Sequence, residues 1–455
     1  MKYKIIIPLL FFTMFLNAQN NPDSVMFNRI FDQELSHGRS HENLHELCKG
    51  YGKRLSGSPI AAGAVEWSFN KMKSYGFDSV YRQEVLVPHW VRGDKETASY
   101  SIKSGSKAMA VRICALGGSI GGKITGKVIE VKSFEELRAL GKDKVKGHIV
   151  FFNRPMDDTK INTFDAYGGA INQREFGANE ASCLGATAVI VRSMSLGINP
   201  YPHTGAMLSY TDSVAKIPAC AISTENAEML SKDLKKSSDL LFKLEMHCQW
   251  LPDTLSYNVI SEIRGTEHPE EIILIGGHLD AWDMAEGAHD DGAGVVQSLE
   301  AIRLIKELNI RPRHTIRCVF YMNEENGMRG GLKYAAEAKQ KKEKHIAALE
   351  SDAGGFTPRG FSFEANGDTL KRLIDYRNLF TPYYMDHFRK GGGGVDIGPL
   401  NKLGTLLIDL EPDTQRYFDF HHSAADVFEG VNKRELEMGA AGITGLVYLI
   451  DKYGL

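Results

Sequence analysis

Four apolar stretches in the C-terminal half of the sequence each end in residues that can bind a metal ion. Imidazole nitrogens and carboxylate oxygens are the ligands that zinc takes in catalytic sites with open positions. A further acidic pair, Asp290 and Asp291, lies in GAHDDGAGVV, and one carboxylate of this pair could bridge two metal ions. The four stretches end at His278 and Asp280, at Glu324 and Glu325, at Ser351 and Asp352, and at His421, His422 and Asp426.

Each of these residues by itself has an ordinary explanation. An acidic residue at the end of a strand is usually a helix cap or a solvated charge, and a single histidine is usually a hydrogen-bonded surface group. Their joint occurrence at the ends of similar apolar stretches favours a shared metal site.

Parallel strands would bring these residues together. The stretches EIILIG, TIRCVFYM, HIAALE and LGTLLIDLEP are nearly continuous apolar runs, which is typical of strands buried on both faces. Helical patterns alternate with them, so the pattern predicts an α/β fold with a mixed, largely parallel central sheet and helices on both faces. In such a sheet the carboxyl ends of the strands meet at one crevice, where ligands bind.

The middle of the chain has a different pattern. It opens with the Gly-rich run GGSIGGKITG, and short apolar strands such as GKVIEV and GHIVFFN then alternate with helical segments. We therefore predict that residues 118–250 form an inserted domain. Residues 19–117 and 251–455 then form one catalytic domain.

The N-terminus has the pattern of an export signal. Lys2 and Lys4 precede a short apolar run that is broken by Pro8 and ends near Ala18, which predicts a cleaved signal peptide over residues 1–18. The protein is then exported to the periplasm or secreted, and no later segment is long enough to span a membrane. The six cysteines show no metal-binding spacing and are expected to be buried free thiols.

The overall charge excludes one class of partner. The 455 residues carry a formal net charge of −3, with no basic stripe of the kind that binds nucleic acid. The expected partner is instead a peptide substrate.

Five motifs together resemble a known family. GGHLDAWD, GAHDDGAG, NEENG, ESDAG and HHSAADVFE are similar, in order and spacing, to the motifs of the co-catalytic dizinc exopeptidases, which include bacterial leucyl aminopeptidases and glutamate carboxypeptidases. Within that family, YGKRLSGSP, VPHWVRG and the inserted segment look most like the plasma glutamate carboxypeptidase branch. The resemblance covers nearly the whole chain after the signal peptide.

The resemblance implies two zinc ions per chain and a role for each motif residue. It places Glu324 as the general base, and Asp280 as the residue that hydrogen-bonds the ligand imidazole from behind. It also implies a cis peptide bond between Asp290 and Asp291. The implied metal ligands are His278 and Asp352 for one zinc, Glu325 and His422 for the other, and Asp290 as the bridge.

Two substrate contacts are less tightly defined by the resemblance. His421 stands where glutamate carboxypeptidases have a tyrosine that helps the oxyanion, so its ring N–H could take that role or the ring could simply pack. Asp396, in the run GGGGVDIG, could meet a free amino terminus at the rim of the pocket. The inserted segment resembles a protease-associated domain, which implies a position near the mouth of the site or in the contacts of a homodimer.

The expected activity is hydrolysis of dipeptides or short peptides by a water activated between two zinc ions. Three alternatives remain open: an aminopeptidase acting on longer peptides, a glutaminyl-cyclase-like enzyme with one zinc, and a non-enzymatic receptor on the same fold. The basic residues that could bind a substrate C-terminal carboxylate are Arg329, Arg389, Lys390 and Arg416.

Overall fold

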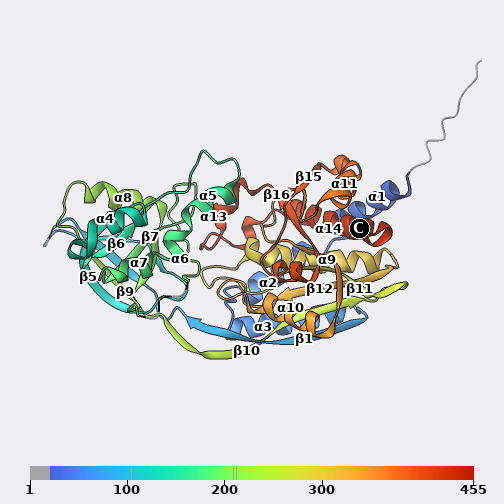
Figure 1. Ribbon diagram of the computed structural model, residues 1–455, viewed down its shortest axis with the longest axis horizontal. Coiled ribbons are helices and arrows are strands. Elements are labelled where there is room, and N and C mark those ends of the chain that lie inside the picture. The colour runs from blue at the N-terminus through green and yellow to red at the C-terminus, as the bar shows by residue number, and fades with distance from the viewer. Residues whose placement is uncertain (1–20, 104, 209, 212) are drawn as a thin grey trace, which may run out of the picture.

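The structure is a computed structural model that describes residues 21–455 except 104, 209 and 212. The predicted signal peptide, residues 1–18, lies outside these described residues. Two eight-stranded sheets occupy opposite ends of the molecule (Figure 1). Among the described residues, no helix combines the length and the apolar character that crossing a membrane requires.

The first sheet contains the strands that lead to the metal-binding motifs. Its order is β1-β10-β12-β11-β13-β16-β14-β15, and β12, β11, β13 and β16 at its centre are parallel to one another. The prediction of a mixed, largely parallel sheet is therefore confirmed. The strands are β1 (Ser79–Val91), β10 (Gln249–Ile263), β11 (His268–His278), β12 (His314–Tyr321), β13 (Lys344–Glu350), β14 (Pro358–Phe363), β15 (His387–Lys390) and β16 (Leu406–Pro412).

Helices cover both faces of the first sheet. The apolar sides of α1, α2, α3, α9 and α14 form the main core on one face, and α10 packs on the other. Shorter helices flank the C-terminal strands. The helices are α1 (Pro22–His37), α2 (Ser40–Tyr51), α3 (Pro59–Ser74), α9 (Ala293–Glu307), α10 (Arg329–Lys341), α11 (Gly367–Asp375), α12 (Arg377–Phe380), α13 (Tyr417–Phe420) and α14 (Lys433–Tyr453).

Strand β11 shows why its sequence is continuously apolar. Ile273 and Ile275 lie in the core beneath α9, whereas Ile272 and Leu274 lie in the core beneath α10. Because successive side chains of a strand point to opposite faces, a strand covered by helices on both sides needs an apolar residue at every position.

The second sheet has the order β3-β2-β9-β5-β6-β7-β8-β4. We call the part of the chain that forms it, residues 97–246, the second-sheet segment. Its strands are β2 (Thr97–Ser101), β3 (Met109–Val111), β4 (Ile113–Ala115), β5 (Gly122–Val131), β6 (Ile149–Phe152), β7 (Ala188–Arg192), β8 (Ala219–Ile222) and β9 (Leu241–Met246), and its helices are α4 (Phe134–Val145), α5 (Thr163–Ala170), α6 (Asn172–Glu175), α7 (Gly177–Cys183) and α8 (Thr224–Leu234).

The second sheet starts earlier in the chain than residue 118, the predicted start of the inserted domain. β2 pairs with β9, and β3 pairs with β2, so residues 97–111 already belong to this sheet. The Gly-rich run that suggested the boundary lies inside the segment. A short strand is stabilised by the edge that it pairs with, so its own composition does not show which of two sheets it joins.

The antiparallel strands β1 and β10 lead the chain out of the first sheet and back into it along one side of the molecule (Figure 1).

The six cysteines are all unpaired, and five of them are buried. Packing is therefore the role that the structure shows for those five.

Candidate metal centre

The carboxyl ends of the central parallel strands bring the predicted ligands together. β11 ends at His278, and the turn after β12 carries Glu324 and Glu325. Asp352 follows β13 by two residues, and His422 follows the short helix α13 after β16. Residues far apart in the sequence therefore meet at the crevice that the strand pattern predicted.

Asp290 lies between two sets of ligand atoms. It comes from the single turn η1 (Ala288–Gly292) that precedes α9. Its Oδ1 is 3.2 Å from Nε2 of His278, which is in turn 3.6 Å from Oδ1 of Asp352. Its Oδ2 is 3.2 Å from Nε2 of His422, which is 3.1 Å from Oε2 of Glu325. Oδ1 of Asp290 thus faces His278 in a group with Asp352, and Oδ2 faces His422, which in turn contacts Glu325.

These distances fit a pair of metal ions. The ligand atoms of a tetrahedral zinc site lie about 2.0–2.1 Å from the ion and therefore about 3.3 Å from one another. Nε2 of His278, Oδ2 of Asp290 and Oδ1 of Asp352 are buried, and among the described residues they have no hydrogen-bond partner. Buried polar atoms without partners are what a bound ion would satisfy.

The clustered carboxyl groups at the centre also favour a bound cation. Burial, together with the neighbouring carboxylates of Asp352 and Glu325, raises the pKa of Glu324 well above its usual range. Burial and Asp290 raise the pKa of Glu325 to about 7. Carboxylates placed this close in a buried site destabilise one another unless a positive charge lies between them.

Asp426 holds the backbone on which Asp290 stands. Its Oδ1 accepts the N–H of His289 at 2.7 Å, and its Oδ2 accepts the N–H of Asp290 at 3.1 Å. The Asp290–Asp291 peptide bond is cis, as the resemblance implied. The sequence pointed to Asp426 as a candidate in HHSAADVFE without a role, and the structure shows that it positions Asp290.

His278 is positioned by two acidic residues. The carboxylate of Asp291 accepts the backbone N–H of His278 at 3.0 Å. Nδ1 of His278 lies 3.0 Å from the backbone carbonyl of Asp280, so the contact expected of the Asp280 side chain is made by its main chain. The Asp280 carboxylate instead accepts the N–H groups of Asn323 and Glu324, because the turn after β12 would otherwise leave these donors buried without partners.

Glu324 and Glu325 point to different places. Oε1 of Glu325 accepts the backbone N–H of Trp282 at 3.0 Å, and its Oε2 faces His422. Oε2 of Glu324 lies 4.0 Å from Nε2 of His278, and its side chain remains 18% exposed. Glu324 therefore remains accessible from the crevice, whereas Glu325 is in contact with His422.

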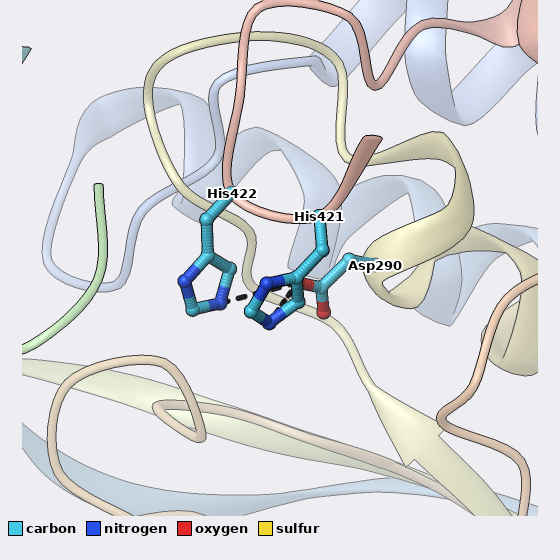
Figure 2. A group of neighbouring side chains, drawn as sticks. All are labelled: Asp290, His421 and His422. Carbon is cyan, nitrogen blue, oxygen red and sulfur yellow. Dashed lines mark ion pairs between the residues drawn. The ribbon is translucent and has the colours of Figure 1, made fainter. Parts of the chain in front are cut away.

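His421 stacks against His422, with ring centroids 3.5 Å apart, and its Nε2 is 3.7 Å from Oδ2 of Asp290 (Figure 2). The ring of Tyr167, from α5, meets it edge-on. Burial and the neighbouring His422 hold the pKa of His421 well below its usual range. The ring is therefore a neutral hydrogen-bonding group beside the centre.

Asp396 does not lie at the rim of a pocket. It is 1% exposed, and both of its carboxylate oxygens are buried without a hydrogen-bond partner among the described residues. Its backbone N–H donates to Glu350 at the end of β13. The Gly-rich run packs against Glu350 at the end of this strand, which places Asp396 in the interior rather than on the surface.

Arg54 is a structural residue that the sequence did not mark. It is 0% exposed, and its guanidinium donates to the backbone carbonyls of Leu279, Glu286 and Gly287. These carbonyls belong to the two ends of the loop between His278 and Asp290. Arg54 belongs to the quoted motif YGKRLSGSP, which was the available signal.

Replacing Arg54 with alanine is expected to lower the free energy of unfolding by about 3 kcal/mol, because three buried carbonyls lose their donor. Urea-induced unfolding followed by circular dichroism measures the change. The matched control is Arg359→Ala, which removes an exposed ion pair with Asp413 and should cost less than about 1 kcal/mol. Equal losses in the two variants would contradict the bracing role of Arg54.

The fold and this site together define a metallo-exopeptidase of the α/β type. The sequence matches the family model described as peptidase family M28 over residues 258–447. The chain belongs to this family, since curated relatives share about a third of its residues over most of its length.

Two of the similar curated proteins are mammalian. Carboxypeptidase Q of Mus musculus is 33% identical over 415 residues, which cover 90% of this chain and 85% of that protein. Carboxypeptidase Q of Homo sapiens is 34% identical over the same shares of both chains.

Solved structures show the same fold. A peptidase M28 precursor from Shewanella amazonensis SB2B superposes with a TM-score of 0.89 at 31% identity and covers 94% of this chain and 96% of its own. A zinc aminopeptidase from Bacillus subtilis reaches 0.63 at 19% identity, covering 90% and 94%, which is a likeness of fold alone.

Proposed function

We propose that this protein is a zinc exopeptidase that hydrolyses dipeptides or short peptides with two zinc ions. The position of Asp290 is the observation that supports the proposal most directly. Its Oδ1 faces His278 in a group with Asp352, and its Oδ2 faces His422, which contacts Glu325, with each histidine 3.2 Å from the carboxylate. A site for one ion would need only one of these pairs, so the arrangement favours two ions over the single zinc of a glutaminyl-cyclase-like enzyme.

In this proposal Glu324 carries the proton. Two zinc ions bound here would lower the pKa of a water molecule and polarise the scissile carbonyl. Glu324, open to the crevice and beside His278, takes the proton from the attacking water and returns it to the leaving amine. The ring of His421 donates a hydrogen bond to the developing oxyanion, as its neutral state and its position beside Asp290 allow.

Arg174 of α6 supports recognition of a substrate C-terminus. It is 6% exposed, its Nε has no hydrogen-bond partner among the described residues, and its guanidinium lies over the ring of Tyr167 beside His421. A buried guanidinium beside the site suits a bidentate carboxylate. Of the basic residues that the sequence suggested, Arg329 pairs with Asp253 and Arg389 with Glu411.

A group of buried acidic residues supports recognition of a substrate amino group at the other end. Asp396 and Glu350 lie together near Glu324, on the side of the centre formed by Asp352. Burial raises the pKa of both carboxyl groups well above their usual range, and an α-ammonium group bound beside them would favour their charged form, while Arg174 would bind a free carboxylate. Opposite charges at the two ends favour an unblocked dipeptide over a longer peptide.

Replacing Arg174 with glutamine is expected to lower kcat/KM for a free dipeptide by about 100-fold, mostly through KM, since a charge-assisted pair is lost. The same dipeptide with an amidated C-terminus should be cut by both forms at similar rates, because it has no carboxylate to bind. Steady-state kinetics on the two substrates make the test. An equal loss on both substrates would contradict the role of Arg174.

Profiling the enzyme against dipeptides, N-blocked dipeptides and amino-acid amides tests the wider proposal. Fast cleavage of free dipeptides alone is the expected result. Fast cleavage of amino-acid amides and longer peptides would instead favour an aminopeptidase. No peptidase activity in the zinc-loaded protein would favour a receptor and would overturn the proposal.

We further propose export to the periplasm or the medium, a protease-associated character for the inserted domain, and assembly as a homodimer. The N-terminal pattern, the resemblance of the inserted segment and its contacts with residues beside the site support these proposals.

A further inference from the structure

One loop of the second-sheet segment contacts the segment that carries His422. The N–H of Thr204 donates to the carbonyl of His422 at 2.9 Å, and His203 forms an isolated antiparallel bridge with Ser423. His422 has φ of 59°, in the left-handed region that residues other than glycine rarely adopt. Such a conformation persists where the surroundings enforce it, and the loop supplies part of that restraint.

The ring of His203 is buried beside this ligand. It is 2% exposed, and neither of its ring nitrogens has a hydrogen-bond partner among the described residues. Nδ1 of His422 is likewise buried without a partner.

A second contact reaches Glu325 through Trp282. The indole of Trp282 is packed in the core of the second sheet, next to Trp90, although it comes from the loop after β11. A Cβ atom at Gly117 would lie 1.9 Å from this indole, so the ring fits only because residue 117 is glycine. The backbone N–H of Trp282 donates to Glu325, and its ring lies 5.9 Å from that of His422.

The two contacts form one unit. The N–H of Gly117 donates to the carbonyl of Gly205, and its own carbonyl accepts the N–H of Met207. Residues 203–207 are therefore fixed to the strand end that Trp282 packs against.

The half of the centre that contains His278 and Asp290 is positioned by a different set of residues. His278 is positioned by Asp280 and Asp291, and Asp290 by Asp426. All of these residues belong to the part of the chain that forms the first sheet.

The geometry points to a specific role for the second-sheet segment: His203 and Gly117 position the His422–Glu325 half of the metal centre, so that one of its two metal positions depends on this segment and the other does not. This inference rests on the proposed two-zinc function. His203 and Gly117 are positioning residues, since they act through His422 and Trp282.

The test is zinc affinity in the full chain carrying His203→Ala or Gly117→Ala. Chelator competition should show one zinc with an unchanged dissociation constant and one weakened by about 10- to 100-fold, the usual cost of removing a residue that orients a ligand. The matched controls are His148→Ala, at a half-buried histidine, and Gly177→Ala, where the added Cβ would meet Phe152 at 2.9 Å within the same segment. Both controls should keep two tight zinc ions.

The outcomes separate this inference from the proposed function. Two tight zinc ions in the wild type and in both variants would overturn the inference alone, as would equal weakening of both ions. A wild-type count of one zinc per chain would overturn the two-zinc proposal and the inference with it. If circular dichroism shows that Gly117→Ala does not fold, His203→Ala tests the inference alone, because it removes side-chain volume without a clash.

Discussion

Replacing Glu324 with glutamine is expected to lower kcat by about 10³- to 10⁴-fold while two zinc ions per chain remain bound. Glutamine keeps the size of the side chain and removes the group that takes and returns the proton. The metal content should persist because Glu325, not Glu324, lies in contact with His422. Steady-state kinetics with a free dipeptide and metal analysis of the dialysed protein measure the two effects.

The matched control is Glu66→Gln, which changes a half-exposed glutamate that pairs with Arg82 at the surface. It should leave both kcat and zinc content unchanged. Nearly normal hydrolysis by Glu324→Gln would rule out Glu324 as the general base. Loss of a zinc ion from that variant would instead place Glu324 among the ligands.

Replacing Asp290 with alanine is expected to remove metal and activity together. Both carboxylate oxygens face a histidine, so one substitution takes a ligand atom from each metal position. Metal ions contribute several kcal/mol to the transition state, and at about 1.4 kcal/mol per tenfold this means a loss of kcat/KM of about 10³-fold or more. Zinc analysis after dialysis and the dipeptide assay give the two measurements.

Asp239→Ala serves as the control for this experiment, since it removes an exposed carboxylate that pairs with Lys127 on the second-sheet segment. It should keep full activity and metal content. Two zinc ions still bound to Asp290→Ala after dialysis would show that Asp290 does not bridge them. Binding of a single zinc with activity intact would favour a one-metal mechanism.

The fold of the first sheet could be predicted because its strands are buried on both faces. β11 and β12 need apolar side chains at nearly every position, so their sequences indicate both the strand and its depth. The second sheet was placed less accurately. Its edge strand β3 and the neighbouring β2 are short and half-exposed, and β9, the other partner of β2, lies more than a hundred residues further along the chain.

At the site, the sequence likewise indicated which residues lie close together but not which of their atoms make the contacts. The sequence indicated that Asp280 supports His278, but not that its backbone carbonyl makes the contact while its carboxylate accepts Asn323 and Glu324. Asp396 was expected at a rim and is buried instead. Which atom of a residue makes a contact depends on the direction in which the chain leaves the strand. The types of the neighbouring residues in the sequence do not determine that direction.

By itself the sequence determined the set of candidate metal-binding residues, because all of them except Asp290 follow apolar strands, and the strand ends of a parallel sheet share one edge. Only the tertiary structure decided that the two oxygens of Asp290 face different histidines. It also decided that Arg174 and His203 reach the centre from another sheet. Strand ends are set by local hydrophobic pattern, whereas these contacts depend on how two separately formed sheets pack together.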